Sequence, residues 1–561
     1  MENDFDAIVV GSGISGGWAA KELTERGLRV LMLDRGRMVR HGEDYPTEHQ
    51  APYDMKFRGM GDNRRHQVEY PGESGSGNEG SGHFFANLKD HPYTTATDKP
   101  FDWTRGNQVG GKSLMWARQS YRYAPINFEE NALDGHGVDW PIRYSDLEPW
   151  YDRVEKFIGV SGTVLDYPTA PGGRYFQPAM PMNTLERDMQ ARLHKAFPDR
   201  ALTMARVANL TQAIGEDRQP CHYCGPCDRG CSTGSYFSTQ SSTLPAAMAT
   251  KRLTVLPDSI VTRIVTDGNG ERATGVEVLD AKSRQRSAYS AKVIFVCASA
   301  LESVRLLLLS ANSRHPAGLA NSSGLVGKYI MDHLLSDFAL SRMPGPPMPH
   351  IYGGRPAALW MPRYRNIRGE KHPDYVRGFQ CNAVVFNDDW QRGARMPGLG
   401  VELKRTLQKT GDWNLLIGAQ CEMLPDIGNQ VTLDPKVRDA WDVPVLRMDV
   451  SFGKNDMAMH KAAGDDMVEM MKTMGYGGVM RIPGKPTPGS SIHEMGGAVM
   501  GRDRRTSVLD AHSRAHDIPN LFITDGAAMA SSSQSNPSIT YMAMTARAAA
   551  FAADEFKAGR L

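Results

Sequence analysis

The chain lacks long hydrophobic runs and an excess of charge of either sign. No stretch of about 18 consecutive apolar residues occurs among its 561 residues, so the sequence predicts no membrane-spanning helix. The formal net charge is only +2, which gives no electrostatic reason to expect nucleic acid or an anionic membrane as a partner. Asp4 and Asp6 interrupt the N-terminal segment, and the apolar run that follows is too short for a signal peptide. The sequence is that of a globular protein, and its length predicts two domains.

Cysteine is scarce, and its seven copies are unevenly placed. Three are scattered, whereas four crowd into residues 221–231 with the spacing C-x2-C-x2-C-x3-C. An odd, clustered set argues against a disulfide framework and favours a metal site. The spacing equals that of a ferredoxin-type iron–sulfur run, although Ser232 stands where that run has proline. A structural zinc held by four thiolates and metal-free cysteines are the alternatives. The candidate ligands are Cys221, Cys224, Cys227 and Cys231.

The first forty residues carry the strongest pattern. Ala7–Val10 is a short apolar run that predicts a buried strand, and the glycine turn Gly11-Ser-Gly-Ile-Ser-Gly16 follows at once. Ser15–Arg26 then predicts a helix, and Leu28–Leu33 predicts a second strand that ends in Asp34. Strand, glycine turn, helix, strand and acid in this order are typical of a dinucleotide-binding site.

This fingerprint assigns roles to its residues. The glycines let the backbone approach a pyrophosphate at the helix N-terminus, and the acid binds a ribose diol. The alternative is a tight turn without a ligand. The motif does not separate NAD from FAD, but its position at the start of a long chain favours a flavoprotein. The predicted cofactor-binding residues of this region are Gly11, Gly13, Ser15, Gly16, Asp34 and Arg35.

Three further segments precede the cysteines. Residues 71–83 are rich in glycine and serine and predict a mobile loop or lid, or a disordered insertion without function. Gly106–Arg122 contains a second glycine site, where small residues would let the backbone pass close to a flat cofactor. Asp139–Gly162 predicts a turn followed by an amphipathic helix capped near Ser145.

Several segments, in the same order along the chain, resemble the glucose–methanol–choline (GMC) family of FAD oxidoreductases. The resemblance is closest to bacterial catalytic subunits of sugar and polyol dehydrogenases, such as glucose, fructose, gluconate and glucoside 3-dehydrogenases. The segments are GSGISGG, VGGKSLMW, DWPIRYSDLEPWYDRVEKFIGVSG, VIFVCASALESVRLLLLS at 293–310, LVGKYIMDH at 325–333 and the block from His493 onward.

The resemblance implies an α/β fold with a Rossmann-like FAD-binding domain and a second, mainly antiparallel substrate domain. The FAD-binding domain would be discontinuous, over residues 1–144, 200–333 and 485–561, with the cysteine loop at 221–231. The substrate domain would comprise residues 145–199 and 334–484. Its strand candidates are Asp337–Ser341, Val376–Phe386, Leu415–Met423, Gln430–Leu433 and Val443–Val450, followed by a helix over Asp456–Met474.

Other elements are predicted within the FAD-binding segments. Thr254–Val278 alternates as a hairpin around Asn269-Gly270, and Lys292–Cys297 is a buried strand followed by a helix over Ala298–Ser310. Pro519–Asp525 predicts a strand that ends in an acid. Ser538–Phe556 predicts the final helix, whose N-terminus would point N–H groups at the flavin ring.

By resemblance, the cofactor is dissociable FAD. Some relatives link FAD covalently through a histidine in the VGG segment, and here Met115 occupies that position. The resemblance also matches Cys221, Cys227 and Cys231 to the ligands of a three-iron cluster, and leaves Cys224 as an extra thiol that would allow a four-iron cluster. The additional FAD-contacting positions are Gly110, Gly111, Ser113, Met115, Trp116, Val261, Ala298, Asp525, Gly526, Asn536 and Pro537.

His493 matches the family's catalytic histidine, and Asn536 its second catalytic position. A neutral imidazole can take the hydroxyl proton of an alcohol while the flavin takes the hydride at N5. Asn536 can hold the hydroxyl oxygen but cannot accept the proton. Glu494 reads as an acid outside direct contact with substrate, or as a solvated acid. Asp332 and His333 read as parts of a structural elbow.

The sequence therefore predicts an FAD-dependent dehydrogenase of a sugar, glycoside or polyol. It would pass electrons through the cluster to a small subunit or a c-type cytochrome. The alternatives are an oxidase that reduces O2, a flavin-containing lyase, and a non-enzymatic electron-transfer or assembly subunit. The resembling dehydrogenases are exported with a partner subunit that carries the signal, so we expect a periplasmic location by co-export, with the cytoplasm as the alternative.

Overall fold

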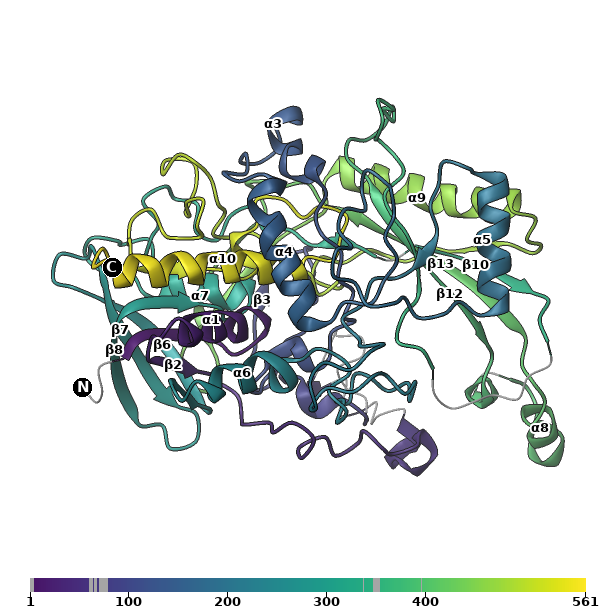
Figure 1. Cartoon of the computed structure of the whole chain (residues 1–561), viewed down its shortest axis with the longest axis horizontal. Helices are drawn as coiled ribbons and strands as arrows, with labels where there is room; N and C mark the ends of the chain where they lie inside the picture. Colours follow the sequence, from purple (N-terminus) through teal and green to yellow (C-terminus); the bar gives the residue numbers. More distant parts are fainter. Residues whose placement is uncertain are drawn as a thin grey trace.

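The computed structural model describes residues 5–59, 64, 68–69, 79–335, 337–346, 354–394 and 396–561. The chain forms an elongated molecule with one sheet toward each end of its long axis (Figure 1). Residues 71–78, the first part of the predicted Gly/Ser-rich loop, lie outside the described residues. Within the described segments, no helix is long and apolar enough to cross a membrane.

The first sheet has a parallel core built from both ends of the sequence. Its parallel strands lie in the order β5 (Leu253–Leu256), β2 (Val30–Leu33), β1 (Phe5–Val10), β8 (Arg286–Val296) and β17 (Leu521–Ile523). The central strands β1, β2 and β17 are almost entirely buried, as is usual for parallel sheets, and α1 (Ile14–Glu25) packs on β1, β2 and β8. β6 (Ser259–Thr266) and β7 (Ala273–Asp280) form a hairpin that extends the sheet antiparallel along the first half of β8.

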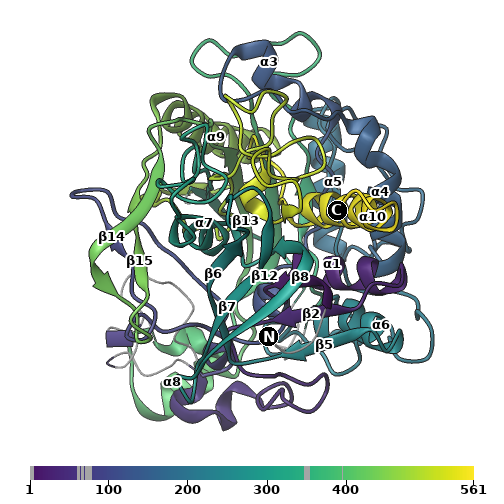
Figure 2. The same cartoon turned by 90° about the vertical axis from the view of Figure 1, so that its left-hand side faces the viewer.

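Helices α1 (Ile14–Glu25) and α10 (Ser538–Lys557) lie side by side on this sheet (Figures 1 and 2). α10 presents a series of buried alanines, which lets the helix axes approach closely. The remaining helices of this half are α6 (Leu244–Ala249), α7 (Ala300–Leu309) and α4 (Tyr144–Ile158), which packs on α10.

The second sheet is antiparallel. Its order is β16 (Met480–Ile482), β10 (Phe338–Met343), β13 (Trp413–Glu422), β12 (Phe379–Asn387), β11 (Leu359–Met361) and β4 (Thr203–Met204), and β9 (His333–Leu334) also pairs with β13. Helix α9 (Lys454–Thr473) packs on β13 and β10 with a methionine-rich buried face. The other helices are α3 (Glu130–Asp134), α5 (Thr184–Ala196) and α8 (Gly400–Leu407).

A small third sheet joins β14 (Gln430–Arg438), β15 (Pro444–Asp449) and β3 (Thr94–Thr95). β14 and β15 contact α7 and form an edge of the molecule in Figure 2. These two strands lie in the segment predicted to form the substrate-domain sheet, but they pair with each other and with β3 instead. The third sheet therefore lies against a helix of the dinucleotide-binding half.

Most predicted elements occur within a few residues of their expected bounds, and two differ in character. The predicted hairpin over 254–278 begins with β5, which joins the parallel sheet beside β2, so only β6 and β7 form the hairpin. Helix α4 begins at Tyr144, so Ser145 is not its cap. The Asp146 carboxylate instead accepts a hydrogen bond from the Arg143 backbone N–H at 2.7 Å.

Candidate active site

The glycine turn and its acid form one hydrogen-bonded unit. Asp34 is buried at the end of β2 and accepts hydrogen bonds from the backbone N–H groups of Ser12, at 3.0 Å, and of Gly36, at 2.8 Å. The Ser12 hydroxyl donates to the same carboxylate. Burial raises the pKa of Asp34, and the Ser12 hydrogen bond partly offsets this rise. The acid is thereby fixed at the carboxyl edge of the parallel strands, where dinucleotides bind.

A single cavity reaches from this acid to the predicted catalytic histidine. It is lined by the glycine turn and the N-terminus of α1, and also by residues of the second glycine segment, the start of α7 and the N-terminus of α10. The predicted residues that line it are Gly11, Gly13, Ser15, Asp34, Arg35, Gly111, Ser113, Val261, Ala298, His493, Asp525, Gly526 and Pro537. Two helix N-termini and a buried acid on one cavity fit an FAD molecule.

The other predicted cofactor residues lie behind this lining. A Cβ atom on Gly16 would come within 1.9 Å of the Gly11 carbonyl oxygen, so Gly16 lets α1 pack against the turn. Gly110 has a φ of 94°, and its N–H donates to the Ser12 hydroxyl at 2.8 Å. Met115 packs beside the cluster of Val39, Tyr45, Phe84 and Leu114, and Trp116 donates its indole N–H to the Phe237 carbonyl at 3.0 Å. None of these four lines the cavity.

His493 and Asn536 lie next to each other although 43 residues separate them. The Asn536 amide nitrogen is 3.1 Å from His493 Nε2. Asn536 precedes Pro537 at the N-terminus of α10, and Pro537 lines the cavity whereas Asn536 does not. Burial, together with nearby His333 and Lys112, lowers the pKa of His493 well below its ordinary value of 6.5. The ring is therefore neutral near pH 7, as a general base requires.

Asp332 fixes the loop that carries His493. Its buried carboxylate accepts hydrogen bonds from the backbone N–H groups of Gly489, at 2.7 Å, and His493, at 3.2 Å, and also from the Ser491 hydroxyl. Burial raises the pKa of Asp332 to about 6 even though Ser491 opposes the rise. The expectation of a structural role fits these contacts.

Three residues of the site were not predicted as such. His333 was expected to be structural, but its Nδ1 lies 2.9 Å from Nδ1 of His493. Lys112 and Glu494 form an ion pair at 2.9 Å on the cavity wall. Lys112 lies inside the second glycine segment and Glu494 directly follows His493. This closeness to predicted site residues was the only indication in the sequence that they belong to the site. Glu494 is buried rather than solvated.

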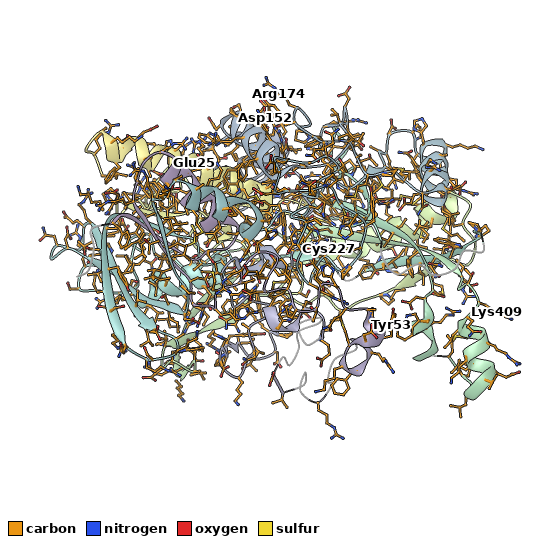
Figure 3. All side chains as sticks on the ribbon, turned by 60° about the horizontal axis from the view of Figure 1, so that its bottom comes forward. Glu25, Tyr53, Asp152, Arg174, Cys227 and Lys409 are labelled. Atoms are coloured by element: carbon orange, nitrogen blue, oxygen red, sulfur yellow. The ribbon has the colours of Figure 1, made fainter. Side chains whose placement is uncertain are left out.

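The cysteine loop lies near the middle of the long axis, between Glu25 of α1 and Lys409 beside α8 (Figure 3). Its four cysteines are partly buried free thiols, and burial raises the pKa of Cys227 to about 11. Within the part of the chain that the structure describes, no group of three or more His, Cys, Asp or Glu side chains is arranged to hold a metal ion.

Two buried arginines, Arg118 and Arg218, interact with this loop. Buried Arg118 opposes the rise in pKa at both Cys221 and Cys227. Burial lowers the pKa of Arg218 to about 10, and nearby Cys231 opposes this fall. Burial and the neighbouring cysteines raise the pKa of Cys224, and Glu48 adds to this rise, so the loop has charged neighbours of both signs.

Comparison with known proteins places the whole chain among flavoenzymes. Residues 5–335 match a sequence family described as GMC oxidoreductase, and residues 425–545 match a second one of the same description. The chain is 27% identical to the fructose dehydrogenase large subunit of Gluconobacter japonicus, over 99% of this chain and 98% of that protein. It is 30% identical to 2-methyl-1,2-propanediol dehydrogenase of Mycolicibacterium austroafricanum, over 98% and 95%.

A solved structure shares the fold. Pyridoxine 4-oxidase from Mesorbium loti superposes with a TM-score of 0.59 over 97% of this chain and 98% of that one, at 18% sequence identity.

Proposed function

The chain belongs to the GMC oxidoreductase family, whose members use FAD to oxidise alcohol CH–OH groups, and on that basis we propose that it is a dehydrogenase of a sugar, glycoside or polyol. The observation that carries the proposal is the contact between His493 and Asn536 beside the cavity that fits FAD. Its near full-length similarity to fructose and propanediol dehydrogenases supports the substrate class.

His493 and Asn536 have different roles in the oxidation of an alcohol. His493 is neutral, so its Nε2 can take the hydroxyl proton. Asn536 holds the reacting oxygen through its amide nitrogen while negative charge develops there. When bound, FAD accepts the hydride from the substrate carbon. Gly11, Gly13 and Ser15 would hold its pyrophosphate, and Asp34 its ribose.

Lys112 and the N-terminus of α10 give the site its charge. Both place positive character on the cavity wall, and the buried Glu494 carboxylate balances Lys112. If FAD binds here, such a wall would favour its anionic form. The same ion pair lies beside His493, and the ammonium group helps keep the imidazole neutral.

We also propose that residues 221–231 bind an iron–sulfur cluster and that a small subunit or a c-type cytochrome accepts the electrons. The cysteine spacing and the two buried arginines support this, since clusters ligated by thiolates carry negative charge. The relative from Gluconobacter japonicus is named a large subunit, which supports a further subunit here. Export with such a subunit would place the protein in the periplasm.

The proposed activity is tested by anaerobic flavin bleaching with a panel of aldoses, polyols and glycosides, followed by product analysis to locate the new carbonyl. We expect one group of sugars or polyols to bleach the flavin and to reduce an artificial acceptor dye. Oxidation of a glycoside at its third carbon would define a glucoside 3-dehydrogenase.

Three other results would each replace the proposal. Fast reoxidation of the reduced flavin by air indicates an oxidase, turnover without bleaching indicates a lyase, and no response to any alcohol rejects the activity. For the cluster, protein purified without oxygen should contain iron and acid-labile sulfide. Zinc without sulfide would assign a structural site, and metal-free active enzyme would reject the cluster.

A further inference from the structure

A continuous line of hydrogen bonds runs through His493 from one half of the molecule to the other. The indole N–H of Trp360 lies 2.9 Å from Gln380 Oε1, and Gln380 Nε2 lies 3.1 Å from Asn536 Oδ1. Asn536 Nδ2 then meets His493 Nε2 at 3.1 Å. On the far side of the ring, His493 Nδ1 meets His333 Nδ1 at 2.9 Å, and His333 Nε2 lies 2.8 Å from the Ser533 carbonyl oxygen.

The two ends of this line have fixed roles. An indole N–H can only donate, and a backbone carbonyl can only accept. Starting from Trp360, Gln380 must accept at its oxygen and donate from its nitrogen, so Asn536 must donate to His493. Starting from Ser533, His333 must carry its proton on Nε2 and accept at Nδ1. Both directions assign His493 the same form, with its proton on Nδ1 and an unprotonated Nε2 that accepts from Asn536.

We propose that His333 and Gln380 are positioning residues that hold His493 in the one tautomer able to act as a base. This inference rests on the proposed alcohol oxidation, and it assigns tasks to two residues outside the reacting pair. If the tautomer were reversed, a proton on Nε2 would face the substrate and Nε2 could not take another. His333 contacts His493 directly at Nδ1, whereas Gln380 acts on Nε2 of His493 by orienting the Asn536 amide.

The surroundings fit this task. Trp360, His333 and Gln380 are at most 1% exposed, so water does not compete for these bonds. Burial lowers the pKa of His333 to about 4, which leaves it neutral and able to accept from His493 at ordinary pH. Gln380 comes from β12 and Trp360 from β11, so the antiparallel sheet sets the orientation of an amide that belongs to the other half of the molecule.

The test compares two substitutions of His333 in the FAD-loaded enzyme. His333→Asn places an amide oxygen where Nδ1 stands and keeps an acceptor for His493. His333→Gln reaches toward Ser533 and keeps that bond but loses the acceptor. We expect His333→Gln to lower kcat by ~10- to 100-fold with little change in KM, and His333→Asn to lose clearly less. His315→Gln, at a buried histidine bonded to the Gly270 carbonyl away from the cavity, is the control.

A second substitution acts from the opposite side. Gln380→Glu has the same shape, but its ionised carboxylate can only accept, so Asn536 would turn over and present its oxygen to His493. We expect a loss of kcat that deepens as pH rises and this carboxylate ionises. Gln380→Met, which removes the polarity alone, should lose activity without that pH dependence.

The tautomer itself is read from the nitrogen-15 spectrum of histidine-labelled enzyme, with His493→Gln used for assignment. We expect a bare Nε2 in the wild type and a protonated Nε2 in His333→Gln. A wild-type spectrum with the proton on Nε2, or equal losses in the two His333 variants with an unchanged spectrum, would overturn the inference. This readout needs no substrate, so it stands even if no alcohol bleaches the flavin and the proposed activity fails.

Discussion

His493 is a base whose strength is set by its surroundings. Burial and the neighbouring His333 and Lys112 lower its pKa, so the ring stays neutral at pH values where a free histidine would be protonated. A lower pKa makes the base available over a wider acidic range. It also weakens its pull on the substrate proton, and the polar contact from Asn536 offsets part of this loss by stabilising charge on the reacting oxygen.

The first prediction concerns pH. Because the folded pKa of His493 lies below its ordinary value, the active form persists as pH falls and is lost only as pH passes below that lowered value. We expect the rate of flavin reduction by substrate to stay constant from pH 8 to below ~6.5 and then to fall. Anaerobic stopped-flow measurements across this range check the prediction. An acid limb centred above pH ~6.5 would contradict it.

The second prediction concerns the catalytic pair. His493→Ala removes the base and should lower turnover by at least ~10²-fold, with normal FAD content. Asn536→Ala should cost less, because it leaves the base in place and a single orienting donor contributes at most ~10³-fold, against up to ~10⁴-fold for a positioned base. Flavin absorbance gives the cofactor content, and steady-state kinetics give the rates. Near wild-type turnover in His493→Ala at saturating substrate would place the base elsewhere.

At this scale the sequence revealed the residues that belong to motifs. The glycine fingerprint, Asp34, His493 and Asn536 were predicted because their order along the chain matches a known pattern. His333 was assigned only a structural role, and Gln380 was not singled out. His333 contacts a residue 160 positions away and Gln380 one 156 positions away. The spacing of nearby residues in the sequence does not indicate contacts over such separations. Such hydrogen-bond partners can be identified only from the folded structure, in which the strands are paired.

Among the elements, α1 depends on the absence of side chains at its start. The close approach of Gly16 to the Gly11 carbonyl lets the helix begin directly over the turn. The N-terminus of α1 thus stays at the cavity, where its free N–H groups can meet a phosphate. Gly17 also allows close packing, because a Cβ atom there would come within 2.4 Å of the Thr243 hydroxyl oxygen.

The third prediction tests this close approach. Gly16→Ala should push α1 away from the turn, destabilise the protein by about 1–3 kcal/mol and lower FAD content. Gly268→Ala is the control, since a Cβ there meets no atom within 4 Å and the backbone is unstrained. Thermal unfolding and flavin absorbance are measured on both. Equal melting temperatures and equal flavin content in the two variants would contradict the prediction, because α1 would then accommodate the added methyl group without loss of stability.

Elements with a strong local pattern were predictable, and short ones were not. β1 and β2 are uninterrupted apolar runs beside the glycine turn, and α10 is rich in alanine, so the sequence placed each within a few residues. β3, β4 and β9 are two residues long and exist only because a partner strand passes beside them. The third sheet was missed for the same reason, since β14 and β15 were found as strands while their pairing with β3 was not.

Across the whole molecule, the cavity gathers segments from distant parts of the chain. Residues 10–15, 105–113, 259–261, 297–309 and 525–541 all contribute to its wall. A bound cofactor therefore contacts several elements of the first sheet at once. Ligands that bind only the folded state stabilise it by mass action.

The fourth prediction follows from this wall. Removal of FAD should lower the melting temperature, and adding FAD back at about 1,000 times its Kd should recover about 4 kcal/mol. Acid precipitation should release the flavin into the supernatant, because Met115 cannot form a histidyl link. Flavin that stays in the pellet, or an apoprotein as stable as the holoprotein, would contradict this.

The strands of the first sheet are synthesised at widely separated times. β1 at residue 5 pairs with β8, whose paired stretch begins at residue 291, and β17 at residue 521 follows later still. A ribosome adds about 5–20 residues each second, so β1 pairs with β2 early but waits on the order of tens of seconds for β8, its neighbour on the other side. Helix α10, which covers α1, is made later still. During synthesis the open edge of β1 therefore has to be shielded from aggregation, and the cavity for the cofactor is complete only after Tyr541 has been made.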